Sequence, residues 1–414
     1  MAISIYHRQT CRLCGSYALN TALILKPTPL EDDFLPREKA EVSLQRFPLE
    51  VVLCESCGHA QLSHVISSNN IYDHYLYQTQ TSPSLIAHFE AVCAHIVKKI
   101  NLSPISTVLD IGCNDGAVLE FFRQHSMKVI GVEPSSVANV ARNKEIPVYQ
   151  AYFDDLTAKE IMKHYGYMSL ITANNIFANV DDLDAFVSAV KILMKPDSVF
   201  IVETGYLKPL IENGVFDFIY HEHLSYFSIK ALRQFFDKHD MHLYDVELVE
   251  TKGGSARLFA QLKQGERAES SAVSQLIQSE EAYGLFGLDL YKNFYERILN
   301  SKRECHRLLD GLKIPKQFLA GYGASHSVTT LLHFFELGDR ISFLVDDNTL
   351  KHNTLSPGYH LPVYDSEAIY KNSIKYALIL PWRFSKNIIS KHLKFMQIGG
   401  RFLEVYPTPA IVDF

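Results

Sequence analysis

The chain has 414 residues, more than one hydrophobic core usually holds, so we expect two or three domains. Apolar residues make up 47% of it and the mean hydropathy is -0.02, values typical of a soluble globular protein. The net charge of -6 gives no electrostatic reason to expect binding to nucleic acid or to an anionic membrane. No apolar run approaches the roughly 18 residues of a membrane helix, and no signal peptide opens the chain, so we expect a cytoplasmic protein.

Four of the seven cysteines form two identical steps, Cys11 to Cys14 followed by Gly15 and Cys54 to Cys57 followed by Gly58. Each C-x-x-C-G turn can aim two thiolates at one ion, so the two turns together predict a tetrahedral zinc site. With four sulfur ligands the ion would be structural, because no position is left for water. A redox dithiol pair and chance are the alternatives. We expect a zinc-binding domain over residues 1–69.

The next segment, residues 70–265, is predicted to be an α/β domain. An amphipathic helix ending near Ile100 precedes alternating strands and helices, with one helix over residues 181–195. This alternation predicts a doubly wound, mostly parallel sheet. The last two strands are close enough to pair as an antiparallel hairpin around Gly253 and Gly254. The predicted strands cover residues 107–111, 128–132, 168–173, 198–203, 243–249 and 257–262.

A glycine-rich turn follows the first of these strands, in the sequence TVLDIGCNDG of residues 107–116. A pyrophosphate-binding turn would follow G-x-G-x-x-G, whereas the two acids here suit a cation. The pattern therefore favours S-adenosylmethionine (SAM) and a class I methyltransferase, with NAD or no ligand as alternatives. The residues predicted to hold SAM are Asp110, Gly112, Asn114 and Asp115 in the turn, Glu133 at the ribose, Phe153 and Asp154 at the adenine, and Asn174.

The run FDFIYHEHLSYF, residues 216–227, follows a strand at the carboxyl edge of the predicted sheet, where ligand clefts of such sheets lie. Tyr220, Glu222 and His223 offer a phenol, a carboxylate and an imidazole, enough for a base, its orienting acid and an oxyanion donor. Two histidines and a glutamate could instead bind a metal, but adjacent residues rarely point at one ion. Asn179, after the strand at 168–173, is a further candidate for contact with the acceptor. Asp181 or Asp182 is expected to cap the helix that follows.

A second glycine turn, Gly321 to Ser325, and a following acid pair, Asp346 and Asp347, predict another α/β domain over residues 266–414. A strand, a glycine turn, a helix and a strand ending in an acid repeat the architecture of the central domain. The repeat need not extend to the ligand. If this turn bound NAD, the protein would be an oxidoreductase.

The zinc pairs together with VLDIGCNDG, ANNIFANVDDL, FDFIYHEHLSYF, KGGSAR and GYGAS, in this order, give a pattern that spans nearly the whole chain. In this the chain resembles the sugar C-methyltransferases that act on nucleotide-linked keto-deoxysugars. The resemblance implies a zinc unit, a central SAM domain and a C-terminal α/β unit that helps to hold the nucleotide-sugar. It also implies that the acceptor is a 4-keto-6-deoxy sugar whose C3 proton is removed to give an enolate.

In that family the histidine matching His223 is the proposed base, with the residues matching Tyr220 and Glu222 around the sugar, and Tyr77 is expected to enter the site as well. A His223 with a pKa near neutral would suit the base role. We expect Gly323 and Ser325 to offer backbone N–H groups to the nucleotide, and Lys351 or Arg383 to offset its pyrophosphate. Two departures from the family are Asn179 and Lys252, where histidine is common. A zinc scaffold that binds SAM without catalysis is the remaining alternative, and the oligomeric state is open.

Overall fold

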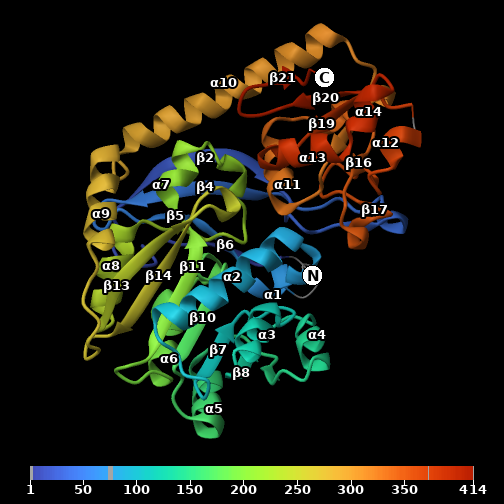
Figure 1. Ribbon diagram of the computed structural model, residues 1–414. Coiled ribbons are helices and arrows are strands. Elements are labelled where there is room, and N and C mark those ends of the chain that lie inside the picture. Colours follow the sequence, from blue (N-terminus) through green and yellow to red (C-terminus); the bar gives the residue numbers. More distant parts are fainter. Residues whose placement is uncertain (1–2, 73–77, 372, 414) are drawn as a thin grey trace.

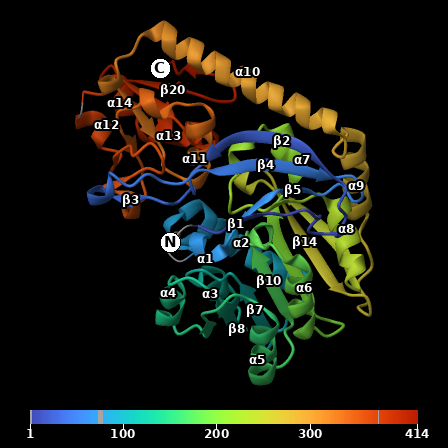
Figure 2. The ribbon, with the colours of Figure 1, turned by 180° about the vertical axis from the view of Figure 1, so that it is seen from behind.

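The computed structural model describes residues 3–72, 78–371 and 373–413. Its elements form three units that follow one another along the chain (Figures 1 and 2). The first unit carries a sheet in the order β12-β5-β4-β2, in which β12 comes from the central part of the chain. The strands of this unit are β1 (Ile5–His7), β2 (Leu19–Thr28), β3 (Leu35–Pro36), β4 (Phe47–Cys54), β5 (Ala60–Leu62) and β6 (His64–Ile66), followed by helix α1 (Ser68–Tyr72).

The central unit is a seven-stranded sheet in the order β13-β14-β11-β10-β7-β8-β9, with β14 antiparallel to both of its neighbours. This confirms the predicted doubly wound sheet and its terminal hairpin. The strands are β7 (Thr107–Ile111), β8 (Lys128–Val132), β9 (Val148–Tyr149), β10 (Leu170–Asn174), β11 (Val199–Gly205), β12 (Ser225–Tyr226, outside this sheet), β13 (Met241–Val249) and β14 (Ser255–Leu262). The helices are α2 (Pro83–Lys99), α3 (Ala117–Gln124), α4 (Ala138–Asn143), α5 (Asp155–Tyr165), α6 (Leu183–Ile192), α7 (Leu207–Glu212) and α8 (Ile229–Lys238).

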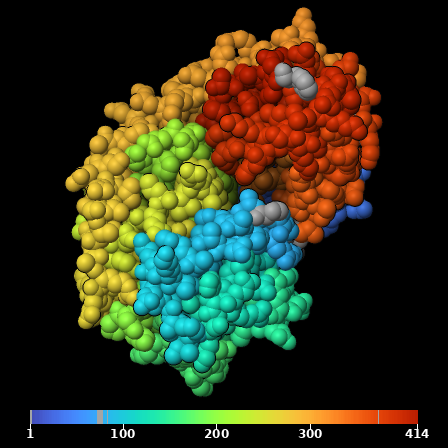
Figure 3. Space-filling view, in the orientation of Figure 1, coloured from blue at the N-terminus to red at the C-terminus, as the bar shows by residue number. Residues whose placement is uncertain are grey.

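Continuous apolar runs make the inner strands of this sheet. The residues of β10 and β11 are buried almost throughout, as expected of parallel strands covered by helices on both faces. Short polar caps start the helices that cover them: Asp182 accepts a hydrogen bond from the Ala185 N–H at the start of α6, which confirms the predicted cap. In Figure 3 the light blue surface of α2 lies between the C-terminal unit and the teal surface of α3.

The third unit holds a six-stranded sheet in the order β18-β16-β15-β19-β20-β21, parallel except for the last strand. This is the second Rossmann-like unit that the sequence predicted. The strands are β15 (Leu319–Tyr322), β16 (Leu344–Val345), β17 (Thr354–Leu355, paired with β3), β18 (Val363–Tyr364), β19 (Tyr376–Ile379), β20 (Arg401–Glu404) and β21 (Ala410–Ile411). Helix α9 (Ser271–Tyr283) packs against α8 and β13 of the central unit. The helices that follow it are α10 (Leu288–Leu312), α11 (His326–Phe334), α12 (Ala368–Lys371), α13 (Ser385–Lys391) and α14 (Leu393–Gln397).

The three units share strands and one apolar core. Strand β12 of the central unit pairs with β5, and β17 of the third unit pairs with β3. One cluster of buried side chains includes Leu49 of β4, Phe216 and Leu331 of α11. The long helix α10 runs over β2 toward the C-terminal unit (Figure 1). None of the helices in the described part of the chain combines the length and apolar character needed to cross a membrane.

Candidate active site

The four paired cysteines converge at one point of the N-terminal unit. Their Sγ atoms lie within 4.8 Å of one another, with 3.6 Å between Cys11 and Cys57 and 3.6 Å between Cys14 and Cys54. Four sulfurs about 2.3 Å from a central zinc would be roughly 3.8 Å apart, so the donor set fits that ion. Gly15 and Gly58 both have a φ of +76°, which lets each turn fold back so that its glycine N–H reaches the first cysteine's carbonyl.

The zinc turn also reaches into the central unit. Arg12 lies between Cys11 and Cys14 in the chain. It is buried and donates to the carbonyls of Leu62 and Leu224. Its Nε lies 2.9 Å from a carboxylate oxygen of Asp181. Tyr6 donates to the same carboxylate, and both residues line the large cavity of the molecule.

The first glycine turn has the strained backbone that its sequence indicates. Gly112 has a φ of +73°, and a Cβ there would lie 2.5 Å from Ile176 Cγ2, so only glycine fits. Asn114 also has a positive φ, of 52°. Its N–H donates to Glu133 at 3.0 Å, and the Ser135 N–H donates to the other oxygen of that carboxylate at 2.9 Å. The turn and the acid at the end of β8 are thereby held together.

Asp110 lies behind the turn, where it is almost fully buried. Thr172 donates to its carboxylate at 2.6 Å and Asn174 at 3.3 Å. Burial raises the pKa of Asp110 to about 7 although these two hydrogen bonds oppose the rise. Asp115 also points away from the main cavity and accepts from the N–H groups of Gln80 and Ala117.

A cavity of about 670 Å³ opens beside this turn. Six of the eight residues predicted to bind SAM line it: Gly112, Asn114, Glu133, Phe153, Asp154 and Asn174. Asp154 has a second task, because it caps α5 by accepting from the Thr157 N–H. The cavity extends from the glycine turn to the N-terminal unit, so it has room for more than a ligand of nucleoside size.

The far end of the cavity is polar. Asn179, Asp181, Glu222 and Lys252 line it. The N-terminal unit adds Ser4, Tyr6 and residues 65–68, at the end of β6 and just after it. Asn179 donates to Glu222 at 3.0 Å, so the predicted acceptor residue and the predicted acid lie in contact.

His223 faces a different, smaller cavity of about 40 Å³, lined also by Phe218, Thr204 and Gly253. Asn175 and Lys252 line both cavities and therefore stand between them. His223 Nδ1 donates to the Phe218 carbonyl at 3.0 Å, which leaves Nε2 as an acceptor for the Tyr220 hydroxyl, also at 3.0 Å. Tyr220 stacks on the imidazole with 4.1 Å between ring centroids.

The expectation of a near-neutral His223 pKa is wrong. Burial, together with the charge of Lys252, lowers the pKa of His223 to about 3. The imidazole is therefore neutral at working pH, and the electron pair on Nε2 accepts the hydrogen bond from Tyr220. Burial raises the pKa of Tyr220 well above its ordinary value, so the phenol stays protonated and donates.

The four residues predicted to hold the nucleotide, Gly323, Ser325, Lys351 and Arg383, line neither cavity. Lys351 is buried and bonds to Asp32 and to the Ala324 carbonyl, each at 2.8 Å. Arg383 pairs with Asp217 at 2.7 Å and lies over the Phe218 ring.

The second glycine turn is closed by its own sheet. The Gly323 N–H donates to the Val345 carbonyl at 2.7 Å, and the Ala324 N–H donates to Asp346 at 2.6 Å. Both amides are used, so the turn offers neither to the pyrophosphate of NAD. Ser325 bonds to Ser327, and the next residue, His326, lies 4.0 Å from Glu222.

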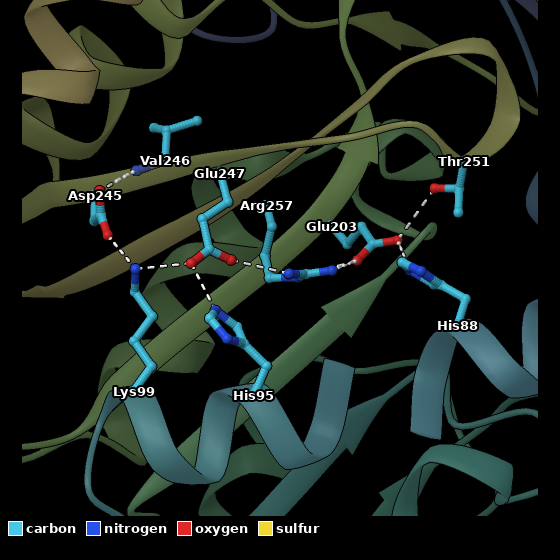
Figure 4. Close-up of polar contacts among 9 residues, drawn as sticks. All are labelled: His88, His95, Lys99, Glu203, Asp245, Val246, Glu247, Thr251 and Arg257. Atoms are coloured by element: carbon cyan, nitrogen blue, oxygen red, sulfur yellow. Dashed lines mark hydrogen bonds and ion pairs between the residues drawn. The ribbon is translucent and has the colours of Figure 1, made fainter. Parts of the chain in front are cut away.

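Helix α2 is fastened to the sheet beside the site by a chain of hydrogen bonds and ion pairs (Figure 4). His88 donates to the buried Glu203 at 2.7 Å, and Arg257 bridges Glu203 and Glu247. His95 and Lys99, on the same face of α2, both bond to Glu247. Just before α2, the N–H groups of Thr79 and Gln80 donate to the side chains of Asn114 and Asp115, so this segment touches the glycine turn. Tyr77 lies outside the described residues.

Several residues of the site carry no local signal in the sequence. Tyr6, Arg12 and Asp181 meet only through the docking of two units. Glu31 is fully buried and accepts from His221 and from the Glu222 N–H, and it too is isolated in the sequence. Lys252 can be noticed in the sequence, because it stands before two glycines in a predicted turn where the resembling family commonly has histidine.

Three family models match the chain in the order of its three units, and the third match begins early enough to include strand β14 of the central sheet. Residues 11–72 match a putative zinc-binding domain, residues 85–245 a methyltransferase domain, and residues 250–409 a C-methyltransferase C-terminal domain.

Individual proteins and solved structures are similar to this chain over different shares of its length. C-methyltransferase NovU from Streptomyces niveus is 31% identical over 405 residues, which is 97% of this chain and 96% of that protein. A ubiquinone biosynthesis O-methyltransferase from Rhodopseudomonas palustris is 28% identical over 26% of this chain and 43% of its own length. Among solved structures, magnesium protoporphyrin IX methyltransferase from Synechocystis PCC 6803 with bound SAH aligns over 47% of this chain and 92% of its own, at 15% identity and a TM-score of 0.34. On the near full-length match to NovU, this chain belongs to the C-methyltransferase family and is a SAM-dependent enzyme with a zinc-binding domain.

Proposed function

We propose that the protein methylates C3 of a nucleotide-linked 4-keto-6-deoxy sugar through an enolate. The observation that carries this is the fixed tautomer of His223, whose Nδ1 is committed to a backbone carbonyl while Nε2 points its electron pair toward a donor. A base held in this way beside a methyl-donor cavity suits deprotonation of carbon. A proton on carbon is acidic enough only next to a group such as a ketone.

The residues divide the work between two ends of the large cavity. Glu133, Asn114 and the glycine turn would hold SAM, which when bound supplies an electrophilic methyl group on sulfonium. At the other end, Asn179 and Glu222 form a hydrogen-bonded pair that would bind sugar hydroxyls.

His223 takes the C3 proton on Nε2, in the place now filled by the Tyr220 hydroxyl. The carbon–hydrogen electron pair passes into the enolate, and the carbonyl oxygen gains the negative charge. That charge, developing beside the imidazole, raises the His223 pKa from its low value in the unliganded site and makes the proton transfer favourable. Tyr220 stays neutral and remains stacked on the imidazole.

A panel of 4-keto-6-deoxy nucleotide-sugars, differing in base and hexose, tests the proposal. Each is incubated with the protein and SAM, and the product is examined by mass spectrometry and by NMR. We expect a gain of one methylene on the sugar, with the new methyl on C3. Methylation of oxygen, or of none of the panel under conditions where SAM binds, would contradict it.

A further inference from the structure

We propose that Lys252 is a catalytic residue whose ammonium group stabilises the enolate oxygen of the acceptor. The inference rests on the proposed function, because it assigns a role within the same reaction. It starts from the position of Lys252 between two cavities.

The reacting carbon must lie between the base and the methyl donor. His223 lines the small cavity, and the SAM-binding residues line the large one. Of the residues in the described part of the chain, only Asn175 and Lys252 line both. A substrate carbon that meets both His223 and the methyl group must therefore pass next to these two side chains, and its neighbouring carbonyl group is within one bond of the same place.

Lys252 is also the cation of this wall. Burial, and after it the charge of Lys252, lower the pKa of His223. Desolvation by the surrounding protein also lowers the pKa of Lys252, and the charges of Glu222 and Glu203 oppose that shift. Within the described residues no hydrogen bond joins its ammonium to another side chain or to the backbone. Lys252 is exposed, and its three N–H donors are therefore available to an oxyanion that forms beside it in these cavities.

The backbone at Lys252 is held in a conformation that a lysine does not favour. Its φ is +56° and its ψ is 26°, in the left-handed region, and Gly253 and Gly254 follow with positive φ values as well. The turn is held by its surroundings: Asn213 donates to the Gly253 carbonyl at 3.1 Å, and Ser255 donates to the Thr251 carbonyl at 3.1 Å. Glycine would adopt this backbone conformation at position 252 without strain. The conformation therefore does not explain why a lysine stands there, which favours a role for its side chain.

The step balances with groups already named. The C3 proton moves to His223 Nε2, its electron pair forms the enolate double bond, and the carbonyl oxygen becomes anionic. Lys252 keeps its protons and donates one hydrogen bond to that oxygen. After methyl transfer the ketone returns and the hydrogen bond weakens, so the interaction is strongest when the charge is greatest.

Deuterium exchange separates this role from methyl transfer. The protein is saturated with S-adenosylhomocysteine, which cannot donate a methyl group, and given the accepted keto-sugar in D₂O. The rate at which C3 gains deuterium is followed by NMR. The variants are Lys252→Met, Lys252→Arg and Lys252→Gly, and the control is Lys313→Met, an exposed lysine with a φ of +49° far from the cavity.

We expect Lys252→Met to slow both exchange and methyl transfer by about 100-fold or more, with S-adenosylhomocysteine affinity within about twofold of the original. Lys252→Arg should recover part of the loss. Lys252→Gly should be as inactive as the methionine variant but melt at the same temperature or higher, which a structural role would not produce. The Lys313→Met control should exchange at the original rate.

Exchange at the original rate in Lys252→Met would overturn the proposal and leave the proposed function intact. Failure of the unaltered protein to exchange or methylate any keto-sugar would instead overturn the proposed function and the role of Lys252 with it. A large loss of cofactor affinity or melting temperature in Lys252→Gly would assign the residue to structure.

Discussion

Arg12 Nε lies 2.9 Å from Asp181 Oδ1, and this contact joins the zinc turn to the wall of the large cavity. The Arg12 side chain is completely buried, whereas that of Asp181 is 28% exposed. Replacing Arg12 with alanine would remove the two hydrogen bonds that its guanidinium donates to the carbonyls of Leu62 and Leu224. We expect this variant to lose about 3 kcal/mol of unfolding free energy, measured by urea denaturation. Arg8→Ala, which removes a more exposed partner of the same carboxylate, should cost about 1 kcal/mol or less. Equal losses would show that burial of Arg12 is not what matters.

Removal of zinc should affect the acceptor more than the cofactor. The cysteines position Arg12 and hence Asp181, whereas the glycine turn belongs to the central sheet. We expect one zinc per chain by elemental analysis, and after chelation a rise in the KM for the acceptor that exceeds any change in affinity for S-adenosylhomocysteine. Cys14→Ser should behave like the chelated protein. A zinc-free protein with unchanged kinetics would contradict this.

Replacement by asparagine should have different effects at the two neighbouring histidines, on activity at His223 and on stability at His221. His223→Asn should abolish nearly all methyl transfer while cofactor affinity, measured by calorimetry, stays close to that of the original protein. His221 is buried against Glu31 and the Phe47 carbonyl, so His221→Asn should lower stability by about 2 kcal/mol. Retained turnover in His223→Asn would remove this residue from the mechanism.

Asp110 gives a stability that depends on pH in a direction opposite to most carboxylates. Its folded-state pKa of about 7 lies above the unfolded value, so the folded protein binds one more proton between those values. Its contribution is complete below the unfolded pKa and is lost as pH rises through about 7. Asp110→Asn keeps the acceptor oxygen for Thr172 and Asn174 and does not titrate.

The stability of Asp110→Asn relative to the original protein should therefore grow by about 2 kcal/mol between pH 5 and pH 7.5. Parallel denaturation curves of both proteins at the two pH values measure it. A difference that does not change with pH would place the Asp110 pKa near its ordinary value.

The sequence predicts what depends on neighbouring residues. The apolar run before Gly112 predicts strand β7 and its turn, and the spacing of Cys11, Cys14, Cys54 and Cys57 predicts their meeting. Contacts between residues that are far apart in the sequence cannot be predicted in this way. Lys351 looks like a free cation in the sequence but is buried against Asp32, more than 300 positions away. The low pKa of His223 likewise depends on burial and on Lys252, neither of which a local pattern can show.

The pairing of β12 with β5 has a consequence for how the enzyme could be divided or recombined. Ser225 and Tyr226 form the strand that completes the N-terminal sheet, and only Leu224 separates them from His223 in the chain. The pairing of β12 with the N-terminal sheet therefore helps to fix the position of His223, the proposed base. A central segment cut out as a portable SAM-binding module would keep its cofactor turn but lose the partner strand that sets the position of its base. Exchange of N-terminal units between relatives should therefore alter the acceptor that is methylated, even though the methyl donor is held elsewhere.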